Sequence, residues 1–127
     1  MQTKNVIVEK SLGFSIEVIK FCELLEAQKK FVIARQLLRS GTSVGANVFE
    51  AQHAESKADF IHKMKVALKE LRESFNALRI VQTVKWLATE KLDSVLDENN
   101  QLISIFVKSI ETATRNDQKN IRQGTRN

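Results

Sequence analysis

Apolar residues recur at three- and four-residue intervals along most of this 127-residue chain. That spacing places them on one side of an α-helix and is typical of amphipathic helices. Polar interruptions divide the pattern, which predicts helices over 11–28, 32–55 and 57–88 and a fourth that starts at Thr89 or Ser94. Four amphipathic helices with short connections predict an all-α fold, an antiparallel up-and-down four-helix bundle.

The first predicted helix carries two apolar stripes where a monomeric surface helix needs one. One stripe consists of Leu12, Ile16, Ile19 and Cys22, and the other of Phe14, Val18, Phe21 and Leu25. Two interpretations stay open. Either the second stripe contacts something outside the bundle, such as another subunit, or this helix is simply well buried.

Very small side chains gather in the second predicted helix, from Ser40 to Ala46. Gly41 and Gly45 are four residues apart and therefore share one helix face. Glycine in a helix interior costs about 1 kcal/mol relative to alanine. Two glycines in a helical pattern indicate either close helix packing or a break in the helix, and the apolar spacing that continues through them favours close packing.

The third predicted helix has a clear start and an unusual end. Ser56 is a suitable N-cap, and Asp59 three residues later completes a pattern like a capping box. Near Trp86 the chain is apolar on several sides, which indicates burial by neighbouring helices or by another subunit. In the fourth helix, the pair Asn99 and Asn100 could bend the helix or end a first short segment.

Composition agrees with long helices, because the chain has no proline and only four glycines. Cys22 is the only cysteine, so no internal disulfide can form. No apolar run reaches the ~18 residues of a membrane helix, and we expect a soluble, cytoplasmic protein without membrane contact. We divide the chain into a polar leader (1–10), the bundle (11–115) and a basic, disordered tail (116–127).

The stretch from Ser40 to Glu70 resembles a known bacterial family. The matching residues are Ser40 to Asn47 in order, then Glu50, Ala51, Ser56, Asp59, Phe60, Lys63 and Ala67 to Glu70. The family comprises the four-helix-bundle proteins first noticed as reading frames within intervening sequences of 23S ribosomal RNA genes. The resemblance implies a ring-shaped homopentamer and no settled activity. A more distant similarity is to the accessory protein of diversity-generating retroelements, a basic pentamer that works with a reverse transcriptase and nucleic acid.

Residues with metal-binding or catalytic potential are few. Glu50 and His53 have the Glu-x-x-His spacing of di-iron bundles. Asp59 and His62 have the same spacing, with aspartate in place of glutamate. These two pairs flank one turn, and His62 is not on the inner stripe, so we predict no metal site. No nucleophile is paired recognisably with a base. We therefore predict a protein that is not an enzyme and has no cofactor.

Polar residues of the family-like stretch could form a network across the second and third helices, near the turn that joins them. Its candidate members are Asn47, Glu50, Ser56, Asp59, Glu70 and Glu73, together with Lys63 and Lys69. Such a network would fix the register of the two helices. The alternative is a binding site for an unknown ligand.

The chain is mildly basic, with a formal net charge of +5. Candidate phosphate-binding residues on the second and third helices are Arg35, Arg39, Lys63, Lys65, Lys69, Arg72, Arg79 and Lys85. A fivefold ring would multiply these charges, and contacts to phosphates would be sensitive to salt. Aromatic residues are scarce on polar faces, which argues against single-strand recognition.

The sequence therefore favours a non-enzymatic, oligomeric four-helix-bundle scaffold that associates with RNA or DNA. The alternative is a protein–protein interaction module that binds no nucleic acid. A third hypothesis, a metal- or ligand-binding bundle, rests on Glu50 and His53 alone.

Overall fold

The structure, a computed structural model, describes residues 3–87 and 89–124 and consists of four α-helices. The helices are α1 (Thr3–Ala27), α2 (Phe31–Gln52), α3 (Lys57–Val84) and α4 (Glu90–Arg122). No strand occurs within those described ranges. The prediction of an all-α four-helix bundle is confirmed.

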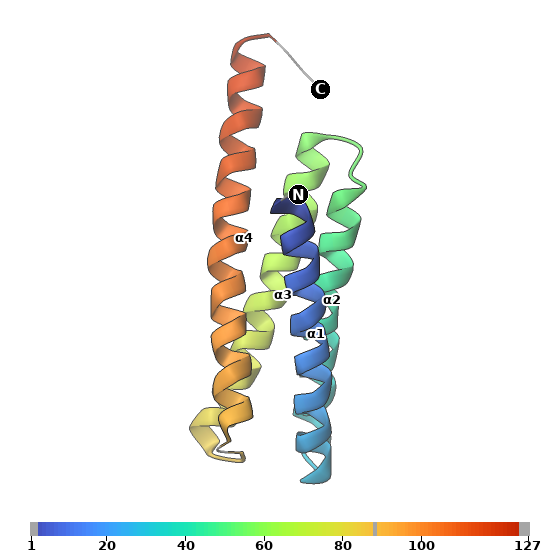
Figure 1. The fold of residues 1–127 in the computed structure, drawn as a ribbon, viewed down its shortest axis with the longest axis vertical. Coiled ribbons are helices and arrows are strands. Elements are labelled where there is room, and N and C mark those ends of the chain that lie inside the picture. Colours follow the sequence, from blue (N-terminus) through green and yellow to red (C-terminus); the bar gives the residue numbers. More distant parts are fainter. Residues whose placement is uncertain (1–2, 88, 125–127) are drawn as a thin grey trace.

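The four helices form one closed bundle. Each packs against its neighbours in sequence, and α1 also packs against α4, so that the order around the bundle is α1, α2, α3, α4. Consecutive helices run in opposite directions (Figure 1). None of the helices, as far as the chain is described, has an apolar stretch long enough to cross a bilayer.

Both ends of the bundle differ from the predicted boundaries. Helix α1 starts at Thr3 instead of residue 11, and Ile7 of the predicted leader is 4% exposed and belongs to the core. Helix α4 continues to Arg122, so most of the predicted tail is helical, whereas residues 125–127 and 1–2 lie outside the described residues. The last turns of α4 project beyond the other three helices (Figure 1).

The N-termini of α3 and α4 are capped by side chains, as the sequence indicated. Ser56 Oγ accepts a hydrogen bond from the backbone N–H of Asp59 at 3.1 Å, and the Asp59 carboxylate accepts one from the N–H of Glu55 at 3.2 Å. Thr89, not Ser94, caps α4, because its hydroxyl accepts from the N–H of Leu92. The bonds from Asp59 and Leu92 satisfy N–H groups that a helix start leaves unpaired.

The two apolar stripes of α1 have different surroundings. The side chains of Phe14, Val18, Phe21 and Leu25 are fully buried in the core. Three residues of the other stripe, Leu12, Ile16 and Ile19, are 60%, 43% and 42% exposed, so the bundle leaves them uncovered. The fourth, Cys22, is buried; its thiol donates to the carbonyl of Ala34, and burial raises its pKa to about 12.

Helix α2 is continuous through Gly41 and Gly45, and both glycines face α1. A Cβ atom on Gly41 would lie 2.7 Å from Val18 Cγ1, and a Cβ atom on Gly45 would lie 3.4 Å from Ser15 Oγ. The Ser15 hydroxyl donates to the carbonyl of Gly41 at 3.1 Å. The prediction of close helix packing is therefore confirmed at Gly41, with α1 as the partner, whereas an added Cβ atom at Gly45 would make only an ordinary contact with α1.

Helix α4 continues without a break through Asn99 and Asn100. Asn99 is fully buried against α3. With its amide oriented to meet complementary partners, it donates to Leu71 O at 3.0 Å and accepts from Phe75 N at 3.1 Å and from Ser74 Oγ at 2.8 Å. Hydrogen bonds to α3 thus explain how a residue of low helix propensity lies inside α4.

Candidate nucleic-acid interface

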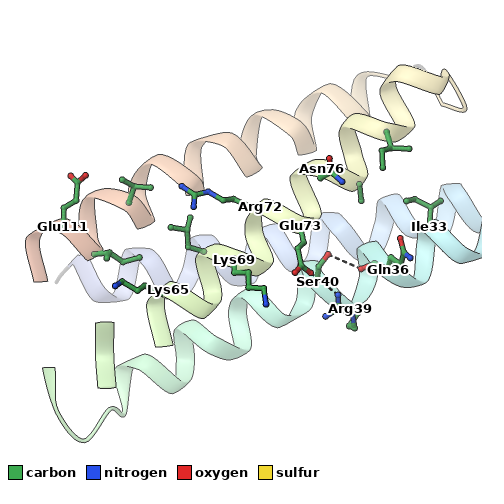
Figure 2. A pocket seen from close by; sticks show the side chains of 15 residues that line it. Ile33, Gln36, Arg39, Ser40, Lys65, Lys69, Arg72, Glu73, Asn76 and Glu111 are labelled. Carbon is green, nitrogen blue, oxygen red and sulfur yellow. Dashed lines mark hydrogen bonds and ion pairs between the residues drawn. The ribbon is translucent and has the colours of Figure 1, made fainter. Parts of the chain in front are cut away.

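A groove with a volume of about 1010 Å³ runs along α3 between α2 and α4 (Figure 2). Four of the eight predicted phosphate-binding residues, Arg39, Lys65, Lys69 and Arg72, line it. Its apolar lining consists of Ile33, Leu68, Ala77, Ile80, Val107 and Ile110, and its remaining polar lining of Gln36, Ser40, Glu73, Asn76 and Glu111. The groove therefore combines an apolar surface with a concentration of positive charge.

Three of these cations come from one face of α3. Lys65, Lys69 and Arg72 follow one another at four- and three-residue intervals, which is the spacing of successive helix turns. All three side chains are exposed, and none forms an ion pair with another described residue. Their charges are therefore available to a ligand.

Arg39 of α2 has a different role, because acidic residues of α3 already neutralise it. Its guanidinium lies 3.1 Å from a Glu73 carboxylate oxygen and 3.4 Å from one of Glu70. The hydrogen bond to Glu73 and the charge of Glu70 raise the pKa of Arg39. Arg39 thus joins α2 to α3 at the edge of the groove (Figure 2).

The other four candidates lie outside the groove. Lys63 pairs with Asp59 on its own helix at 3.2 Å. Arg35 is exposed on α2, and Lys85 follows the end of α3 with a left-handed backbone, φ 59°. Arg79 lines a separate hollow of about 350 Å³ between α3 and α4, together with Asp93 and Asp97. The eight cations consequently do not form one continuous patch.

The predicted polar network across α2 and α3 is not a single network. Asn47 donates to the carbonyl of Ser43 within α2, at 2.9 Å. Ser56 and Asp59 form the cap of α3 and the ion pair with Lys63, all on the α3 side of the turn. Only Glu70 and Glu73 reach across to α2, through Arg39. The Glu50 side chain is exposed and forms no hydrogen bond or ion pair with another described residue.

The two histidines lie apart from these groups. His53 Nδ1 lies 3.1 Å from the carbonyl oxygen of Phe49, and its ring packs against that of Phe49 with centroids 4.7 Å apart. His62 is exposed on α3. In the part of the chain that the structure describes, no three histidine, cysteine or acidic side chains are grouped closely enough to hold a metal ion.

The structure also brings together charged residues that sequence reasoning missed. Lys91 of α4 forms an ion pair with Glu17 of α1, and this hydrogen bond lowers the pKa of Glu17. Nearby, burial and the charge of Glu17 raise the pKa of Glu98, whose Oε1 is buried without a hydrogen-bond partner. Periodicity carries no signal for such pairs, because Glu17 and Lys91 are 74 positions apart in sequence.

A second contact that the sequence did not reveal joins the connections between helices. Lys30 Nζ lies over the Trp86 ring, 4.7 Å from its centroid. This is the geometry of a cation–π interaction. Trp86 itself is 37% exposed instead of buried by its neighbours.

Comparison with known proteins identifies a matching family and a similar solved structure. A family model described as the 23S rRNA-intervening sequence protein matches residues 3–108. The chain is also similar to a solved protein of unknown function from the S23 ribosomal protein family of Bacteroides thetaiotaomicron, with 35% sequence identity and a TM-score of 0.82. That match covers 87% of this chain and 99% of the other. No curated protein matches this chain.

Proposed function

The chain belongs to the family of 23S rRNA-intervening sequence proteins, and from that premise we propose that it is a non-enzymatic, oligomeric scaffold that binds the phosphate backbone of RNA or DNA. The observation that carries the proposal is the row of Lys65, Lys69 and Arg72 along one side of the α3 groove. Three cations without carboxylate partners are suited to phosphate oxygens, because each can displace a counterion that is condensed on the nucleic acid.

The groove favours contact with the backbone over the reading of bases. Lysine and arginine bind phosphates through charge, and such contacts position a nucleic acid without specifying its sequence. The carboxylates of Glu73 and Glu111 at the groove would repel phosphates that approach them. We therefore expect affinity for many sequences and strong dependence on salt.

The proposal includes assembly of the chain into a ring-shaped homopentamer. Its support is the apolar stripe of Leu12, Ile16 and Ile19, which the single chain leaves 60%, 43% and 42% exposed. Burying such a stripe between subunits removes apolar surface from water, which stabilises the assembly by about 25 cal/mol for each Å² of apolar surface buried. A ring would repeat the groove cations in each subunit. Light scattering that gives a monomer mass would remove this part of the proposal.

The decisive experiment is a salt titration of binding to a labelled RNA and a labelled DNA of arbitrary sequence, followed by fluorescence anisotropy. The test variant is Lys65→Glu, Lys69→Glu and Arg72→Glu. The control variant is Arg115→Glu, Lys119→Glu and Arg122→Glu, which changes the net charge equally on the projecting part of α4. The proposal expects the groove variant to lose binding and the control to keep most of it.

The salt dependence gives a second measure. The logarithm of the binding constant falls as the logarithm of the salt concentration rises. Losing three phosphate contacts should make the slope of this line shallower by about 2 to 3. If wild-type protein binds neither nucleic acid at low salt, the proposal is wrong. If both variants weaken binding equally, the interaction follows net charge and does not use the groove.

The second candidate function is a protein–protein interaction module. It is supported by the same exposed stripe on α1, because an uncovered apolar face marks an interaction site. Leu12→Ser with Ile16→Ser should then abolish binding to a protein partner and leave the oligomer intact. A loss of the oligomer in this variant would assign the stripe to self-assembly instead.

A further inference from the structure

Two connections between helices meet at one end of the bundle, the lower end in Figure 1. One joins α1 to α2 and contains Lys29 and Lys30, and the other follows α3 and contains Lys85 and Trp86. The contact of Lys30 Nζ with the Trp86 ring, at 4.7 Å, fixes their proximity. This end therefore combines an indole ring with three lysines.

Aromatic side chains at this end are accessible. Trp86 is 37% exposed, and Phe31, which follows Lys30, is 48% exposed. Lys30 occupies one side of the Trp86 ring. Aromatic side chains that are accessible and lie beside cations are the groups on which unpaired bases stack.

The α3 groove leads toward this end. Lys65 and Glu111 lie at one end of the groove and Ile33 at the other, close to the start of α2 (Figure 2). Ile33 is three residues from Lys30, and Ile80, which also lines the groove, is six residues from Trp86. From Arg72 to the end of α3 is about 18 Å at 1.5 Å per residue. A nucleic-acid strand of moderate length can therefore reach from the groove cations to Trp86.

We propose that Trp86 is a stacking platform for a base of single-stranded nucleic acid whose backbone follows the α3 groove. The inference rests on the proposed function and specifies its ligand, because a duplex keeps its bases paired and unavailable for stacking. The combination of a cationic groove with an aromatic ring at its end is the usual construction of a single-strand site.

Lys30 has a defined part in this arrangement. Its ammonium group lies at the ring, so it can pair with the phosphate next to a stacked base. Glu26 and Glu90, at the adjoining helix ends, offset part of the lysine charge. At this end of the bundle, affinity for the single strand should therefore come from stacking of a base on Trp86 and not from net charge.

The chain itself provides a spectroscopic probe, because Trp86 is its only tryptophan and it contains no tyrosine. The experiment titrates the full-length protein with a single-stranded oligouridylate of about 12 nucleotides, a length within single-strand site sizes. Tryptophan emission and the anisotropy of the labelled oligonucleotide are measured on the same samples. A duplex of equal length is titrated in parallel.

Three variants separate stacking from charge. Trp86→Ala removes the ring, and Trp86→Phe retains a stacking surface. Phe49→Ala is the matched control, because Phe49 is an exposed aromatic residue, at 57%, near the opposite end of α2. Circular dichroism and thermal melting establish that each variant is folded.

The inference expects the single strand to quench emission from Trp86 and the duplex to leave it unchanged. Trp86→Ala should weaken single-strand binding about tenfold to a hundredfold with an unchanged salt slope, since no phosphate contact is lost. Trp86→Phe and Phe49→Ala should each stay within about threefold of wild type.

Other outcomes are equally decisive. Saturable binding by anisotropy without any change in emission overturns the inference and leaves the groove proposal standing. Equal weakening by Trp86→Ala and Phe49→Ala also overturns it. If neither the single strand nor the duplex binds, by emission or by anisotropy, the proposed function is wrong, and the inference with it.

Discussion

Helix α1 meets its two neighbours through contacts of different kinds. Against α2, the interface includes two glycines, and Gly41 lies so close to Val18 that a Cβ atom there would be 2.7 Å from it. Against α4, the interface includes the ion pair of Glu17 with Lys91 and the partly buried Glu98. Close packing at a glycine thus distinguishes the first interface, and charged side chains distinguish the second.

Because of this difference, pH and salt should affect the stability of the α1–α2 and α1–α4 interfaces differently. The packing at Gly41 involves no titratable group, and the Cys22 thiol, which donates to Ala34 of α2, has a pKa raised to about 12. The α1–α2 interface should therefore be insensitive to salt and to pH near neutrality. The α1–α4 interface contains carboxylates with shifted pKa values, so its contribution to stability should change with both. Substitutions on the two sides of α1 can test this comparison.

The largest effect is expected from Gly41→Ala. The added Cβ atom would collide with Val18, a fully buried β-branched side chain that cannot rotate away easily. Overpacking of this kind costs about 1 to 3 kcal/mol, and the contacts of 2.7, 2.9 and 3.1 Å with Val18 atoms place this substitution in the upper part of that range, above the roughly 1 kcal/mol that alanine gains in helix propensity. We expect a net loss of about 1 to 2 kcal/mol in the free energy of unfolding, measured by urea denaturation.

Gly45→Ala is the matched control for this substitution. Its Cβ atom would lie 3.4 Å from Ser15 Oγ, an ordinary contact. The gain in helix propensity should then dominate and stabilise the protein by about 0.5 to 1 kcal/mol. If both variants are destabilised equally, the close approach at Gly41 is not what distinguishes this interface.

A smaller effect is expected from Glu98→Gln in the α1–α4 interface, and it should stabilise the protein, whereas Gly41→Ala should destabilise it. Burial raises the pKa of Glu98 above the ordinary 4.5, so its carboxylate opposes folding once the pH exceeds that raised value. Wild-type protein should therefore lose stability as the pH rises through the folded-state pKa, whereas the variant should lack this loss. At pH 7 the variant should be more stable by about 0.5 to 1 kcal/mol.

The test of Glu98→Gln compares urea denaturation at neutral pH and near the ordinary glutamate pKa of 4.5. The advantage of the variant should shrink at the lower pH, because more than half of folded wild-type Glu98 is then protonated. An advantage that is the same at both pH values would contradict a role for the Glu98 charge.

The smallest effect is expected from Glu17→Gln. The hydrogen bond from Lys91 lowers the pKa of Glu17 below 4.5, so this carboxylate contributes stability above that pH and loses it as the pH falls through the folded-state value. Because the pair is partly exposed, we expect a loss of about 0.5 kcal/mol at pH 7, and less at about 1 M salt.

Lys20→Gln is the control for the Glu17 substitution. Lys20 lies 3.8 Å from Glu17 and is 58% exposed, so its removal should produce no measurable change. Equal losses in the two variants would mean that Lys91 is not the important partner. Glu17→Gln should also lower the pKa of Glu98, whose value the Glu17 charge helps to raise.

Features that repeat along the chain could be predicted from the sequence. The stripe that includes Phe14 and Val18 was identified from its spacing and is fully buried. The cap at Ser56 and the close packing at Gly41 also followed from local patterns. The partner of the glycines could not be predicted, because helix periodicity shows which face is packed and not which helix it meets.

Features that depend on distant contacts could not be predicted. Helix α1 starts earlier than expected because Ile7 packs into a core formed by residues far along the chain. Asn99 was expected to disturb its helix, and hydrogen bonds to α3 accommodate it instead. At the candidate site, four predicted cations line one groove, but the pairing of Arg39 with Glu70 and Glu73 required coordinates.

The length of α4 has a consequence for how firmly its backbone is protected. No described residue after Ala113 is buried, and the helix nevertheless continues to Arg122 beyond the ends of its neighbours (Figure 1). These last turns have little tertiary support, and helical segments of this length are marginal in water by themselves. Amide hydrogens there should exchange with deuterium far faster than those around Phe106, which should open only with the whole bundle.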